Sequence, residues 1–275
     1  PGALLIAEES TAFPGMTAPT SKGGLGFDYK WNMGWMNDVL DYMSMDSYFR
    51  SYHHDEVTFS MCYAFSEHYI LPLSHDEVVH GKKSLIGRMP GEYADKFSQT
   101  RLLLMYQMAH PGKKLTFMGT ELAQFIEWNF RQSLDWLLLD YPIHEAFANY
   151  RRTLNELYRK YDAFWSGEYN PDHFLWLDCD HPELDACAIL RKGQEATVFA
   201  AFNFGDTELK DYELTLPGKG KITPLLNSDW KCFGGRTARP KALRSKTTTG
   251  SVKLTLAPYS AQLYRFEPAV EKETK

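Results

Sequence analysis

LPLSHDEVVHG, residues 71–81, is a short apolar run that ends abruptly in a cluster of ionisable side chains. The run predicts a buried strand over residues 69–73, with His75 and Asp76 just beyond its C-terminal end. In parallel α/β folds, functional side chains lie at that end of the strands. The stretch therefore predicts an α/β fold class and the place of a site.

The same pattern occurs at the start of the chain. Residues 3–7 (ALLIA) predict a second buried strand, followed directly by Glu8 and Glu9. A carboxyl behind a buried strand is partly desolvated, which raises its pKa toward the range that a general acid needs near neutral pH. A solvated pair of loop carboxylates is the alternative. Two strand ends thus predict one site with acidic groups and a histidine.

Alternating elements characterise the first part of the chain, residues 1–164. Residues 9–32, rich in Gly and Pro, predict a long ordered loop. Apolar periodicity predicts helices over residues 34–45, 56–66, 93–109 and 143–161. Further strands are expected over residues 114–118 and, more weakly, 133–136. This order predicts a parallel sheet covered by helices.

Short strands alone are predicted from residue 165 onward. They cover residues 174–177, 186–190, 196–202, 212–216, 252–256 and 262–266. Turn residues separate them, a pattern typical of an all-β sandwich, here over residues 165–268. Residues 231–250 predict an exposed hairpin or loop, and residues 269–275 a disordered tail.

Composition bounds the function. The chain has 275 residues, 44% hydrophobic and 24% charged, which is enough for a sizeable core in one or two domains. A net charge of -5 gives no reason to expect nucleic acid or an anionic membrane as partner. No apolar run approaches the ~20 residues that span a bilayer, and no secretory signal opens the chain. Four scattered cysteines indicate reduced thiols, so we expect a cytoplasmic protein.

The remaining motifs are weaker. His75 and His80 lie five positions apart, which on a helix separates their rings by about 140°, so we expect no metal. His75 and Asp76 are either a hydrogen-bonded loop pair or two groups that bind a hydroxylated substrate. Glu121 is a third strand-end carboxylate, and Trp128 either packs in a loop or faces a sugar. The sequence contains no phosphate-binding, dinucleotide or nucleophile-elbow motif, which disfavours nucleotide and triad chemistries. No cofactor is implied.

Together these segments resemble the α-amylase superfamily (glycoside hydrolase family 13) and, within it, the branching-enzyme family. The resemblance covers nearly the whole chain, most specifically IAEEST with FPG behind it at residues 6–15 and LSHDEVVHGKKS at residues 73–84. GGLGFDYKWN at 23–32 and residues 113–124 also match. The resemblance implies a partial (second-half) TIM (β/α)8 barrel over residues 1–164, followed by a C-terminal β-sandwich domain.

Roles follow from the resemblance residue by residue. Glu8 matches the general acid/base, Asp76 the transition-state stabiliser, and His75 a contact to hydroxyls of the same sugar. Glu121, Trp128 and Glu9 are expected near the substrate, with Glu9 not catalytic. The resemblance implies transfer of an α-1,4-glucan segment to a 6-hydroxyl, forming α-1,6 branches in glycogen.

One group required by that chemistry has no counterpart in the sequence. Retaining glycoside chemistry needs a second carboxylate as nucleophile, about 5 Å from the acid. The family places it in an Arg-x-Asp segment, which does not occur in this sequence. The chain also opens with Pro-Gly and a strand, so we expect a fragment, inactive alone, whose partner is the N-terminal half of the same enzyme. A non-catalytic α-glucan-binding module and an α-amylase-type hydrolase remain the alternatives.

Overall fold

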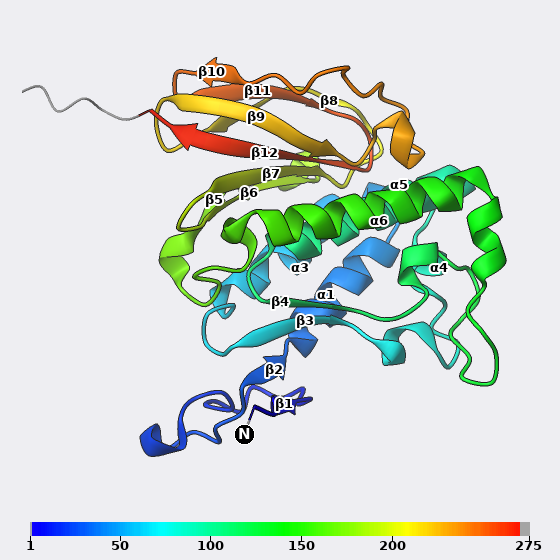
Figure 1. The fold of residues 1–275 in the computed structure, drawn as a ribbon, viewed down its shortest axis with the longest axis vertical. Helices are drawn as coiled ribbons and strands as arrows, with labels where there is room; N and C mark the ends of the chain where they lie inside the picture. Colours follow the sequence, from blue (N-terminus) through cyan, green and yellow to red (C-terminus); the bar gives the residue numbers. More distant parts are fainter. Residues whose placement is uncertain (1, 270–275) are drawn as a thin grey trace, which may run out of the picture.

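The computed structural model describes residues 2–269. Three levels are visible in Figure 1: an all-β unit at the top, helices in the middle, and a small parallel sheet with the N-terminal segment below. The helices are α1 (Met33–Ser44), α2 (Ser47–Arg50), α3 (Asp55–Thr58), α4 (Leu85–Arg88), α5 (Tyr93–Ala109) and α6 (Pro142–Lys160). No helix within this range is long and apolar enough to cross a membrane.

The lower sheet is parallel throughout. Its order is β1-β2-β3-β4, from β1 (Ile6–Ala7), β2 (Tyr29–Trp31), β3 (Tyr69–Leu73) and β4 (Lys113–Thr116). Only β3 is buried along its whole length, because strands flank it on both sides, α1 packs against it, and Gln107 of α5 donates to its Leu71 carbonyl. Within the described residues, the outer edges of β1 and β4 have no strand partner.

The upper unit contains two antiparallel sheets. One has the order β10-β9-β12-β7-β6-β5, and the other pairs β11 with β8. The strands are β5 (Phe174–Asp178), β6 (Ala186–Lys192), β7 (Thr197–Asn203), β8 (Leu209–Thr215), β9 (Gly220–Asn227), β10 (Lys246–Thr248), β11 (Ser251–Leu256) and β12 (Ser260–Pro268).

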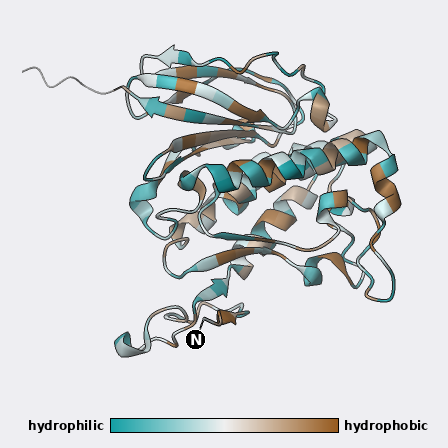
Figure 2. Ribbon diagram, in the orientation of Figure 1, coloured by the Kyte–Doolittle hydropathy of each residue, from teal (hydrophilic) through white to brown (hydrophobic). Residues whose placement is uncertain are grey.

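Both faces of the six-stranded sheet are covered, which explains why β6 and β7 are almost continuously apolar. Ile189 and Phe202 belong to the core shared with the helices. Leu190, one position from Ile189 on β6, and Phe199, three positions from Phe202 on β7, belong to a second core shared with β8 and β11. Successive strand residues point to opposite faces, so one sheet serves two cores. Figure 2 shows the resulting brown colour along β6 and β7.

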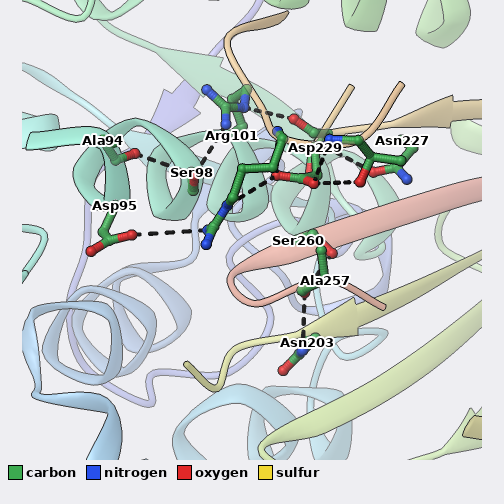
Figure 3. A network of polar contacts seen from close by, with 12 residues as sticks. Ala94, Asp95, Ser98, Arg101, Asn203, Asn227, Asp229, Ala257 and Ser260 are labelled. Carbon is green, nitrogen blue, oxygen red and sulfur yellow. Dashed lines mark hydrogen bonds and ion pairs between the residues drawn. The ribbon is translucent and has the colours of Figure 1, made fainter. Parts of the chain in front are cut away.

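Helix α5 lies between the parallel sheet and the six-stranded sheet, and it packs against β7 and β12 of the six-stranded sheet. Its residues from Phe97 to Ala109 are all buried, polar ones included. Arg101 is 0% exposed; its Nε donates to the Ser228 carbonyl at 2.7 Å, and an Nη to Ser98 Oγ at 3.1 Å (Figure 3). Arg50 donates to the Phe204 carbonyl and Arg191 to the Ala109 carbonyl, at 2.6 and 3.0 Å. Three buried guanidinium groups therefore join the helices to the all-β unit.

The structure confirms most predicted elements and corrects several. Residues 93–109 form a helix as predicted. The segment at 133–136 is not a strand; a 3-10 helix, Trp136–Asp140, follows instead. Residues 56–66 contain only short helical turns. The predicted loop 9–32 contains the strand β2.

Further corrections concern strand extent. The first strand covers two residues rather than five, and Leu4, Leu5 and Ile6 are exposed rather than buried. Strands β9 and β10 were not predicted, because Pro224 interrupts the pattern of one and basic residues surround the other. The predicted tail lies outside the described residues except for Ala269.

Candidate active site

The predicted groups all follow strands of the parallel sheet, on the side of the sheet where the strands have their C-terminal ends. Glu8 directly follows β1, His75 and Asp76 follow β3, and Glu121 follows β4. Strands β3 and β4 end level with each other, because Leu73 pairs with Thr116. Strand β1 does not reach this level. Its last residue, Ala7, pairs with Lys30 of β2, and Lys30 pairs with the first residue of β3 rather than the last.

A capping box determines the turn after β3. The Ser74 N–H and hydroxyl both donate to Glu77 Oε2, at 2.8 and 2.6 Å. This starts the 3-10 helix η4 (His75–Val78) immediately behind the strand. His75 and Asp76 are left facing solvent, their side chains 46% and 47% exposed, with His75 Nε2 3.2 Å from Asp76 Oδ1. The turn thus presents an imidazole and a carboxylate side by side.

Aromatic side chains support His75. Phe117, just after β4, lies against the imidazole with ring centroids 5.9 Å apart. The Trp128 ring packs edge-on against Phe117, at 5.0 Å and 87°, and the backbone N–H of Trp128 donates to the Val78 carbonyl. Trp128 is only partly exposed, so it supports the site from behind as well as bordering it. Phe117 was not singled out from sequence, because an apolar residue at a strand end looks like core.

Glu127 holds the loop behind the site. Its carboxylate accepts the N–H groups of Gly81 and Lys83 at 3.1 and 2.8 Å. These two hydrogen bonds lower the pKa of Glu127. The loop needs such support because His80 and Lys83 have positive φ angles of 58° and 68°. Carboxylate partners in loops give no periodic signal, so the sequence pattern did not reveal this role.

Glu8 and Glu9 differ in environment. Glu8 is exposed, and within residues 2–269 its side chain has no hydrogen-bond or ion-pair partner. The desolvation expected of Glu8 is therefore absent. Glu9 pairs with Lys30 Nζ at 2.8 Å, which lowers the pKa of Glu9 to about 2, with help from Thr11. Lys30 is buried and also donates to the Thr11 carbonyl, so it anchors the loop that carries Glu8.

Glu121 accepts a hydrogen bond from the Gly119 N–H at 2.9 Å, within its own turn. Gly119 has φ of 90°, and a Cβ there would meet the Gln124 side chain at 2.8 Å, so the turn requires glycine. The cavity behind this turn measures only ≈ 10 Å³, room for about one water molecule. Across the described residues no cluster of three metal-ligating side chains occurs. The side chains of His75 and Asp76, 46% and 47% exposed, lie on an open surface.

Comparison with known proteins bears on both parts of the chain. Residues 176–267 match the family described as "Alpha amylase, C-terminal all-beta domain". The 1,4-alpha-glucan branching enzyme GlgB of Halothermothrix orenii is 50% identical over 237 residues, 86% of this chain and 38% of that protein. GlgB of Bacillus cereus strain Q1 is 44% identical over 270 residues, 95% of this chain and 42% of that protein. The chain spans about two fifths of these relatives' length.

Solved structures show the same fold at low identity. The α-amylase from H. orenii superposes with a TM-score of 0.62 at 14% identity, covering 96% of this chain and 53% of that one. An Anoxybacillus α-amylase gives 0.59 at 18%, covering 98% and 53%.

The identity to the GlgB proteins over most of the chain, together with the match of residues 176–267, shows that the chain belongs to the α-amylase family. Within that family, the chain belongs with the C-terminal part of the 1,4-alpha-glucan branching enzymes.

Proposed function

We propose that this chain carries the acid/base and stabilising half of a glucan-branching active site. The observation that carries the proposal is the parallel order β1-β2-β3-β4. Because the strands are parallel, Glu8 and the His75–Asp76 pair both lie beyond C-terminal strand ends, on the same side of the sheet. Residues 1–164 would form the second half of a (β/α)8 barrel, and residues 165–268 its C-terminal sandwich domain. The open edges of β1 and β4 support this, because a closed barrel pairs every strand.

The proposed reaction is a retaining double displacement. A nucleophilic carboxylate attacks the anomeric carbon of an α-1,4-glucan, while Glu8 donates its proton to the departing glucosidic oxygen. Asp76 and His75 bind hydroxyls of the reacting glucose. Glu8 then removes the proton from a 6-hydroxyl of the acceptor, whose oxygen displaces the enzyme carboxylate and forms the α-1,6 branch.

The nucleophile is proposed to come from a segment outside these 275 residues, which contain no Arg-x-Asp sequence. Such a segment would also cover Glu8, which is exposed here. Burial of a carboxyl group favours its protonated form, which is the form that a general acid needs. The proposed partners are therefore the N-terminal half of the enzyme and an α-glucan such as glycogen, in the cytoplasm.

The experiment measures iodine absorbance on amylose with the chain alone, and then mixed with a separately produced N-terminal half of a branching enzyme. A fall in absorbance only in the mixture, without new reducing ends, is the expected result. Asp76→Asn and Glu8→Gln should each abolish that fall. Turnover by the chain alone would contradict the missing-nucleophile part of the proposal.

The same assay separates the two alternatives. New reducing ends in proportion to the lost iodine colour would indicate an α-amylase-type hydrolase. No change with any mixture, combined with slower migration of the chain in glycogen gels, would indicate a glucan-binding module without catalysis.

A further inference from the structure

Two tyrosines on a short helical segment are the most exposed large aromatic residues within 2–269: Tyr52 at 77% and Tyr48 at 75%. They lie four positions apart on α2 and the 3-10 helix η2 (Ser51–His53). The backbone stays helical at Ser51, with φ of -59° and ψ of -27°. Residues four apart on a helix are neighbours on one face. Both rings therefore face the same solvent region.

The segment that carries these rings is well anchored. The Asp46 side chain caps α2 by accepting the Tyr48 N–H at 3.0 Å. Phe49 lies edge-on to the Tyr48 ring, with centroids 5.1 Å apart. Arg50, 0% exposed, donates to the Phe204 carbonyl of the all-β unit. A ligand meeting this face would find a rigid surface, with little ordering entropy lost on binding.

Beside Tyr52 runs a shallow groove of ≈ 430 Å³ that is widely open to solvent. One side is helical and the other is the loop between β5 and β6. Its lining comprises Ser51, Tyr52, His54, Asp55, Thr58, Cys179, Asp180 and Pro182. The two sides are joined by a contact of 3.1 Å between His54 Nε2 and the Cys179 carbonyl. The loop side is itself fixed, because Asp178 accepts from the Tyr212 hydroxyl at 2.5 Å.

The groove's chemistry selects a class of ligand. Asp55 and Asp180 make its charge negative, while burial lowers the pKa of His54 and leaves that ring neutral at pH 7. Anionic ligands such as phosphates, nucleic acids and acidic lipids are therefore disfavoured. Carboxylates accept hydrogen bonds from the hydroxyls of neutral polyols, and Ser and Thr hydroxyls both donate hydrogen bonds to them and accept hydrogen bonds from them. An adjacent exposed aromatic face offers an apolar surface for the C–H face of a sugar ring.

We infer that Tyr48, Tyr52 and this groove form a second α-glucan-binding site, separate from the turn that holds His75 and Asp76. The inference rests on the proposed function for the identity of the sugar. A glucan chain held here would be tethered to both the helices and the all-β unit, since both contribute to the groove. The site would retain a polymeric substrate while the reacting segment is exchanged at the sheet edge.

The test is affinity electrophoresis of the full 275-residue chain in native gels containing increasing glycogen. Wild type should be retarded, and Tyr52→Ala should weaken the apparent dissociation constant about tenfold, equivalent to about 1.4 kcal/mol. Tyr48→Ala should weaken it less. Tyr141→Ala is the matched control, since Tyr141 is a similarly exposed tyrosine, at 55%, and should bind like wild type.

Asp76→Asn separates this inference from the proposed function. If Asp76→Asn still binds glycogen while Tyr52→Ala does not, the second site is supported whatever the branching assay shows. If wild type migrates freely, or if Tyr52→Ala is retarded like wild type, the second site is ruled out, and the branching proposal still stands on its own assay. Circular dichroism of each variant confirms that loss of binding is not loss of folding.

Discussion

At the residue scale, Lys30 is a buried cation whose partner Glu9 lies next to the proposed acid. The ion pair lowers the pKa of Glu9 from 4.5 to about 2. A depressed carboxyl pKa stabilises the fold above the unfolded-state value, and this stabilisation is lost as pH falls from about 4.5 towards 2. We therefore expect Lys30→Met to be less stable than wild type at pH 6, with the difference shrinking by pH 3.

Urea unfolding at pH 6, 4 and 3 measures that difference directly. Lys22→Met is the control, because Lys22 is an exposed lysine in the neighbouring loop and should show no such pH trend. A difference that stays constant from pH 6 to pH 3 would mean that Lys30 contributes by packing, not through the charge of Glu9.

Glu127 offers a second test at this scale. Glu127→Gln retains the shape but exchanges a carboxylate for a neutral amide, weakening both hydrogen bonds to the loop. We expect amide hydrogen exchange at Gly81 and Lys83 to accelerate severalfold, with little change in global stability. Glu156→Gln, at an exposed position of α6, should leave exchange at these amides unchanged. Unaltered exchange in Glu127→Gln would show that the loop is held by other contacts.

At the element scale, a continuous apolar run made β3 predictable and a long segment rich in apolar residues made α5 predictable, whereas their surroundings were not. Helix α5 was predicted from its apolar residues, yet polar residues such as Gln99 and Gln107 are buried as well. Each finds a tertiary partner: Gln107 donates to the Leu71 and Leu115 carbonyls and so links β3 to β4. Strand β2 escaped prediction because three residues are too short for an alternating pattern.

The candidate site shows the same limit. His75, Asp76 and Glu8 were identified from their positions behind apolar runs. Their supports, Phe117, Lys30 and Glu127, act through contacts between residues far apart in sequence, which no local pattern encodes. The exposure of Glu8 also could not be read from the string, because it depends on which segments cover the sheet edge.

Arg101 tests the attachment of α5 to the all-β unit. Arg101→Met preserves much of the buried volume but leaves the Ser228 carbonyl without its 2.7 Å donor. An unsatisfied buried acceptor costs about 1–3 kcal/mol, and we expect the free energy of unfolding to fall by that amount in urea titrations. Arg152→Met is the control, since Arg152 is exposed on α6 and, within residues 2–269, its side chain bonds only to Asn149, one turn away. Equal stabilities of the two variants would argue against a joining role for Arg101.

At the scale of the whole molecule, the six-stranded sheet belongs to two cores at once. Its inner face is completed by β8 and β11, and its outer face by α5. The proposed boundary near residue 165 therefore divides the chain by type of secondary structure and leaves one continuous core across the division. An all-β unit can be recognised from sequence as a sandwich, but the second covered face becomes visible only when both parts are seen together.

This shared core predicts how the all-β unit behaves when separated. Residues 165–275 produced alone would expose Ile189, Phe202 and Leu263, each buried at 0% in the full chain. Exposing a large apolar side chain costs about 1.5–3 kcal/mol, so the separated unit should lose several times that amount. We expect it to self-associate in size-exclusion chromatography and to unfold at lower temperature than the full chain.

Replacing Phe202 by Ser should reduce the self-association of the separated unit but destabilise the full chain. The opposite result would be a monomeric unit that unfolds cooperatively at the same temperature as the full chain. It would show that the core between the six-stranded sheet and β8 and β11 is enough to stabilise the unit, and that the buried arginines join two independently stable parts.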